Sequence, residues 1–124
     1  MSKLQQEALD RGINLFNERR FFEAHEEWEQ ECRLMTTGEE KTFFQGLIYA
    51  AAAFLHYQRH ECAGAKELLN RSLSSLRAGM DEHPDISIGQ LIADLTRLKE
   101  PFESCTFDLQ ERSLPIIHRN LVNW

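Results

Sequence analysis

A chain of 124 residues, 42% hydrophobic and 27% charged, is long enough for one globular domain around a single core. Its net charge of −6 opposes contact with a phosphate backbone, so nucleic acid is not an expected partner. The start of the chain lacks the apolar stretch of a signal peptide, and the most apolar run, Phe43 to Leu55, is shorter than the roughly 20 residues that span a bilayer. We therefore expect a cytoplasmic protein that does not enter the membrane.

The three cysteines, Cys32, Cys62 and Cys105, are an odd number and stand at spacings unlike those of metal sites. Thiols of cytoplasmic proteins stay reduced. We predict that all three are free and pack as small apolar groups.

The first predicted helix runs from about Ser2 to Glu18, and Ser2 with Gln5 predicts a capping box at its start. The second helix follows a short turn and contains the stretch Phe21 to Glu31, which reads FFEAHEEWEQE. At 100° per residue, its buried face is predicted to hold Phe21, Ala24, Trp28, Cys32 and Met35.

The third predicted helix, from about Gly38 to His60, is apolar nearly all round and therefore belongs at the centre of a bundle. Thr37 with Glu40 predicts a capping box at its start. One polar line runs along this helix, formed by Gln45, Tyr49, His56 and His60.

The fourth predicted helix runs from about Glu61 to Gly79. The fifth begins with a capping box of Ser87 and Gln90 and is predicted to run to about Lys99, because Pro101 stops it. We predict an all-α fold in a single domain of residues 1–124. It is a compact bundle of about five helices, built from two antiparallel helical hairpins, plus a C-terminal tail that docks back.

Three stretches between Leu15 and Leu76 resemble a known family. They read LFNERRFFEAHEEWE, FQGLIYAAAAFLH and GAKELLNRSLSSL. They resemble the domain of unknown function 309, a family with a Phe-Phe-Glu-Ala-His-Glu signature and a later Gln-Gly-Leu-Ile. The resemblance implies a small intracellular helical bundle and no established activity. The family's signature positions correspond here to Phe21, Phe22, Glu23, His25, Glu26, Glu29, Gln45, Gly46 and His56.

This chain departs from the family pattern at one position. The pattern has a Trp three residues after Glu29, where this chain has Cys32, and a Trp stands at position 28 instead. The surroundings of the usual Trp are therefore expected to differ here.

Candidate ligand-binding residues lie on the sides of the second and third helices that are expected to face each other. His25 and Glu29 share one side of the second helix because they are four residues apart. The third helix offers Gln45, Tyr49 and His56. If the two sides meet, His25, Glu29 and His56 can hold a divalent transition metal or act as an acid and base pair. Glu23 and Glu26 are secondary candidates.

The same residues also support a structural interpretation. HEEWE lacks the second His of the His-Glu-x-x-His metalloprotease motif. A His at the edge of an apolar face is typically a hydrogen-bond donor, so His25 and His56 are predicted to bond to Glu29 and Gln45. Such a buried network fixes the register of the helices.

Two functions from different classes remain open. The one that the sequence favours is a non-catalytic interaction or scaffold module, which binds a protein partner or a second copy through its exposed flank and the tail from Pro115 to Trp124. It needs no cofactor. The alternative is a small-ligand or divalent-metal-binding protein, or an enzyme, with its site between the second and third helices.

Overall fold

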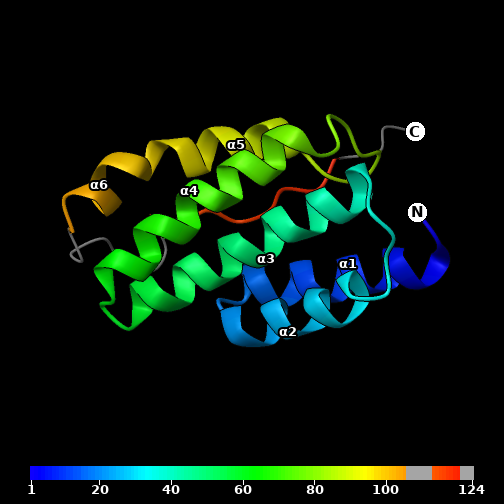
Figure 1. The fold of residues 1–124 in the computed structure, drawn as a ribbon, viewed down its shortest axis with the longest axis horizontal. Coiled ribbons are helices and arrows are strands. Elements are labelled where there is room, and N and C mark those ends of the chain that lie inside the picture. The colour runs from blue at the N-terminus through cyan, green and yellow to red at the C-terminus, as the bar shows by residue number, and fades with distance from the viewer. Residues whose placement is uncertain (106–112, 121–124) are drawn as a thin grey trace.

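The computed structural model describes residues 1–105 and 113–120. The predicted all-α bundle is confirmed over these residues. Its helices are α1 (Lys3–Asn17), α2 (Phe21–Cys32), α3 (Glu39–Gln58), α4 (Cys62–Ala78), α5 (Ile88–Arg97) and α6 (Lys99–Glu103). In Figure 1, α3 lies at the centre between α2 and α4, α1 packs on α2, and α5 and α6 pack on α4. Short turns at 18–20 and 59–61 join α1 to α2 and α3 to α4 as antiparallel hairpins.

Among the described helices, none is long and apolar enough to cross a lipid bilayer.

The buried face predicted for α2 is confirmed, because Phe21, Ala24, Trp28, Cys32 and Met35 are all buried. The Trp28 indole crosses over to α1, where its Nε1 donates a hydrogen bond to the Leu9 carbonyl oxygen at 3.3 Å. A Cβ atom at Gly12 would overlap the indole ring. Glycine at this position therefore allows α1 and α2 to approach each other as closely as they do.

The helix ends agree with the sequence at one place and differ at others. The capping box of Ser2 and Gln5 is confirmed, with its two hydrogen bonds at 2.8 and 3.1 Å. The capping box predicted at Thr37 is wrong, because Gly38 precedes α3 and no side chain caps it. The box predicted at Ser87 is also wrong, because the Ser87 hydroxyl donates to Asn120 Oδ1 in the C-terminal segment instead.

Pro101 does not end α5, contrary to the prediction. The helix α5 stops at Arg97, and Pro101 lies within the first turn of α6. The first-turn N–H groups of a helix have no partner inside the helix, so a proline there removes no helical hydrogen bond.

The prediction of three free cysteines is wrong for two of them. Cys62 and Cys105 form a disulfide, with their Cα atoms 5.5 Å apart. They are 43 residues apart in sequence and meet only because α6 returns to the start of α4. The third cysteine, Cys32, is a free and buried thiol, as predicted.

The predicted docking of the tail is confirmed for residues 113–120, which run as an extended segment behind α3 and α4 in Figure 1. Leu114 and Ile117 are buried and Ile116 is exposed. The Asn17 side chain holds the main chain of Ile117 through two hydrogen bonds, at 2.8 and 3.1 Å. Arg19 donates to the carbonyl oxygens of Leu114 and Pro115 at 2.6 and 2.9 Å. The remainder of the tail, residues 121–124, lies outside the described residues.

Candidate functional site

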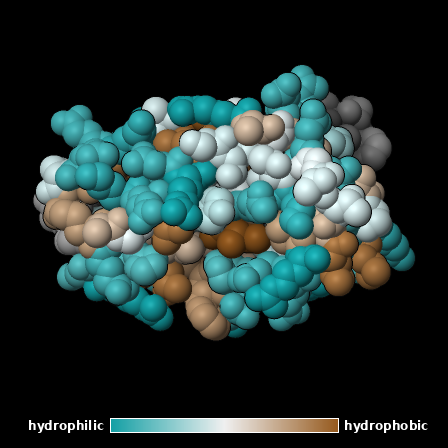
Figure 2. Space-filling model, in the orientation of Figure 1, coloured by the Kyte–Doolittle hydropathy of each residue, from teal (hydrophilic) through white to brown (hydrophobic). Residues whose placement is uncertain are grey.

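A cleft of about 370 Å³ opens between α2 and α3, a size typical of small-ligand sites. Its floor is apolar and is formed by Ile48 and Ala52 of α3 with Leu68 of α4. Figure 2 shows a hydrophobic strip along the middle of this face, with hydrophilic surface on both sides. The remaining lining residues are His25, Glu29, Cys32, Arg33, Lys41, Gln45 and Tyr49.

The local sequence explains why polar side chains reach this cleft. His25, Glu29 and Arg33 follow one another at four-residue intervals, so they form a single row along the flank of α2. The neighbouring face of α2 is fixed to the core by Trp28. On α3, Lys41, Gln45 and Tyr49 repeat the same interval, and they form the opposite wall.

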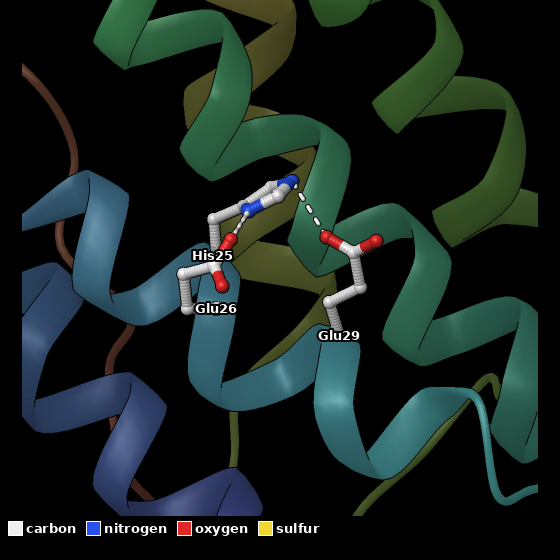
Figure 3. Close-up of side chains that lie close together, drawn as sticks. All are labelled: His25, Glu26 and Glu29. Carbon is white, nitrogen blue, oxygen red and sulfur yellow. Dashed lines mark ion pairs between the residues drawn. The ribbon is translucent and has the colours of Figure 1, made fainter.

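His25 lies between two carboxylates of its own helix, as Figure 3 shows. Its Nδ1 is 3.4 Å from Glu26 Oε1, and its Nε2 is 3.2 Å from Glu29 Oε2. The other oxygen of Glu29 accepts a hydrogen bond from Arg33 at 2.7 Å. The imidazole is 26% exposed, so it stands at the rim of the cleft and is not a core side chain.

These three side chains also form a group that can hold a metal ion. One nitrogen of His25 and one oxygen each of Glu26 and Glu29 lie within 4.8 Å of one another. Among the described residues, it is the one set of at least three His, Cys, Asp or Glu side chains whose ligand atoms lie this close together. The group contains Glu26 where the sequence had suggested His56.

His56 is not part of the cleft. Its Nδ1 lies 3.2 Å from Glu61 Oε1, close to the turn between α3 and α4. The ring packs over Gly64, where a Cβ would lie 2.8 Å from Nδ1. His56 projects from the same side of α3 as Gln45 and Tyr49, but it lies seven residues beyond Tyr49, about 10 Å further along the axis, where the end of α3 adjoins α4.

Gln45 and Tyr49 are half-buried lining residues. Within residues 1–105 and 113–120, neither side chain has a hydrogen-bond partner. They therefore offer an amide and a phenol to a ligand in the cleft.

Glu23, a secondary candidate from the sequence, does not line the cleft. It accepts a hydrogen bond from Arg20 at 2.6 Å, and this bond lowers the pKa of the exposed Glu23 carboxyl. Its role here is a surface ion pair.

Sequence reasoning missed Arg33 and Lys41, the two cationic residues of the lining. Their four-residue spacing from Glu29 and Gln45 was the available signal. Cys32 also lines the cleft, but burial raises the pKa of its thiol. Cys32 is therefore a neutral, largely buried group and not a thiolate ligand.

Residues 9–68, just under half of the chain, match the family model described as "Domain of unknown function (DUF309)". The resemblance inferred from the sequence motifs is thereby confirmed, and the matched region contains every lining residue of the cleft. No curated protein matches the chain.

Proposed function

We propose that this protein binds a divalent transition metal at the rim of the α2–α3 cleft, through His25 Nε2 and Glu29. One observation supports the proposal above all, which is the distance of 3.2 Å between these two ligand atoms. Two ligands that share one ion at about 2.1 Å are themselves about 3.0–3.4 Å apart. The side chains can thus accept an ion with little rearrangement.

Glu26 contributes by orienting the imidazole. Metal-bound His residues commonly donate the N–H of the second ring nitrogen to a carboxylate, which fixes the tautomer. Glu26 Oε1 occupies that position beside Nδ1. It leaves the Nε2 lone pair for the metal, beside Glu29.

The position of His25 also bears on the structural interpretation of the motif. Both of its carboxylate partners lie on α2, so these contacts do not link α2 to α3. A network that sets the register between helices requires partners on both. The ligand-binding function is for this reason the one that the geometry favours. The open positions of the ion and the free groups of Gln45 and Tyr49 would then serve a small ligand.

The test is a calorimetric titration of the untagged full chain with Zn²⁺, together with Co²⁺ absorption in the visible range. We expect saturable binding of one ion per chain, which His25→Ala abolishes and Glu26→Gln weakens about 10–100-fold. His118→Ala is the matched control, because His118 is an exposed histidine that does not line the cleft.

The variant His56→Ala distinguishes the metal ligands seen in the structure from the set predicted by the sequence, which included His56. We expect it to leave Zn²⁺ binding unchanged, since His56 is paired with Glu61 outside the cleft. Absence of saturable binding up to about 1 mM metal would refute the proposal. Loss of binding in His56→Ala but not in His25→Ala would refute it equally.

The interaction module is a second candidate, supported by exposed apolar side chains at both ends of α2. Phe22 is 51% exposed and Leu34, just after α2, is 80% exposed. Leu114 and Ile117 are buried in their own bundle, so a self-association surface would use Phe22 and Leu34. Light scattering tests this idea, because Phe22→Glu should then convert a dimer into a monomer. A wild-type monomer at high concentration would exclude the dimer.

A further inference from the structure

The disulfide between Cys62 and Cys105 closes one end of the bundle. Cys62 is the first residue of α4, and Cys105 follows the end of α6 by two residues. In Figure 1 the start of α4 and the end of α6 meet at the left end of the molecule. An ion pair between Lys66 and Glu103, at 3.1 Å, joins the same two helices.

The two sulfur atoms have different surroundings. Cys105 is exposed, in a turn where its φ is +57°. Cys62 is half-buried, and its Sγ lies 4.0 Å from the Phe102 carbonyl oxygen. An incoming thiolate therefore reaches the sulfur of Cys105 more easily than that of Cys62.

The helix α4 favours Cys62 as the leaving group. A thiolate is stabilised at a helix N-terminus by the helix dipole and by first-turn N–H groups that lack partners. The residue before α4, Glu61, makes no capping hydrogen bond to these groups. Disulfide exchange is faster when the departing thiol has a low pKa.

We propose that Cys62–Cys105 is a thiol–disulfide exchange site with a fixed direction, attacked at Cys105 by a dithiol reductant. The first thiolate of the dithiol bonds to Cys105 Sγ, the bond between the two cysteines breaks, and its electron pair leaves on Cys62. The second thiol of the dithiol then attacks the mixed disulfide and releases Cys105. Two electrons pass to the protein, which gains two thiols, and the dithiol becomes a disulfide.

Reduction would loosen the attachment of α6. This helix has five residues, and Phe102 is its buried side chain. Phe102 stacks on Tyr57 with ring centroids 5.1 Å apart and meets Phe54 at 6.2 Å. In the reduced protein, these ring contacts and the Lys66–Glu103 pair are left to hold the helix. Amide exchange over α6 is therefore expected to increase while exchange over α3 stays unchanged.

The direction of attack is tested with glutathione on the full chain purified without reductant. Early time points are quenched with acid, free thiols are alkylated, and peptides are identified by mass spectrometry. We expect glutathione on Cys105 and the alkyl group on Cys62. Glutathione on Cys62, equal labelling of both, or two free thiols before any reductant is added would overturn the proposal.

A matched pair of variants tests the leaving group. Glu61→Gln removes a negative charge beside Cys62, so reduction by dithiothreitol is expected to be about two- to five-fold faster. Glu67→Gln removes the same charge from the exposed Glu67–Arg71 pair further along α4 and should not change the rate. Equal rates for the two variants would contradict departure of a Cys62 thiolate.

Discussion

Two faces of the bundle use their polar side chains in opposite ways. On the face that carries residues 113–120, polar side chains hold the main chain of another segment, as Asn17 and Arg19 do. Asn120 there donates to the carbonyl oxygens of His83, Pro84 and Ile86. In the α2–α3 cleft, His25, Glu29 and Arg33 pair within α2, and Gln45 and Tyr49 have no hydrogen-bond partner in the described chain. Lys41 is the exception, because it donates to the Met35 carbonyl oxygen at 3.3 Å. The difference separates side chains that maintain the fold from those available to a ligand.

The two histidines of these faces show the same contrast. His83 is 5% exposed, and both of its ring nitrogens are engaged. Its Nδ1 accepts from the Asp85 N–H at 3.0 Å, and its Nε2 lies 3.2 Å from Gln6 Oε1. His25 is partly exposed and touches carboxylates of α2. Burial and the location of its partners make His83 structural, whereas His25 is accessible at the rim of the cleft.

The largest effect is expected from the apolar anchor of the C-terminal segment. Ile117→Ala should lower the free energy of unfolding by about 2–5 kcal/mol, because Ile117 is 1% exposed and its loss leaves a cavity. Ile48→Ala in the cleft floor is the control and should cost less, since Ile48 is only half-buried. Urea unfolding measures both. An equal loss would mean that the two faces are equally important for stability.

A smaller difference is expected between two amide side chains. Asn17→Ala leaves the N–H and carbonyl groups of Ile117 without partners and should cost about 1–3 kcal/mol. Gln45→Ala removes a side chain that has no hydrogen-bond partner in the described residues, so its cost should stay below about 0.5 kcal/mol. Thermal unfolding compares them, and a reversed order would contradict the assignment of the two faces.

The contribution of His83 to stability should depend on pH. Burial lowers the pKa of His83 from its ordinary value of 6.5, although Asp85 and Asp10 oppose the effect. The unfolded chain then binds the proton more readily than the folded chain does. Stability is therefore fully present above pH 6.5 and falls as the pH drops through the lower folded-state pKa. Urea unfolding at several pH values above 5 should show a steeper decline for the wild type than for His83→Gln.

The smallest effect on stability is expected at the proposed metal ligand. His25→Ala removes partly exposed contacts within one helix, so the metal-free protein should lose no more than about 1 kcal/mol. Saturating Zn²⁺ should raise the melting temperature of the wild type and not that of the variant. A large loss of stability in the metal-free variant would instead support the structural network predicted from the sequence.

The sequence is sufficient to predict which face of α2 is buried. Trp28 and its neighbours on α2 were assigned correctly because a 3.6-residue period fixes direction within one helix. The same period does not say which stretch of one helix lies opposite the next. Gln45, Tyr49 and His56 share one side of α3, but Gln45 and Tyr49 line the cleft beside α2, whereas His56 lies further along the axis, beside α4.

Contacts between segments far apart in the sequence could not be predicted either. The sequence predicts that Ser87 caps α5, but its hydroxyl donates a hydrogen bond to Asn120 Oδ1 instead. Cys62 and Cys105 were expected to be free, but the course of the chain through α5 and α6 brings them together. Local patterns contain no information on a partner that arrives from more than 30 residues away.

Gly12 links the packing of α1 on α2 to the geometry of the cleft. It belongs to α1, which contributes no residue to the lining of the cleft. Yet the hydrogen atom in place of its side chain sets how far α2 stands from α1, and α2 carries His25 and Glu29 on the flank next to Trp28. A single methyl group at position 12 would push the Trp28 ring outward and shift one wall of the cleft relative to the other. The distance between the two walls of the cleft thus depends on the absence of a Cβ atom at Gly12, on a helix that does not line the cleft.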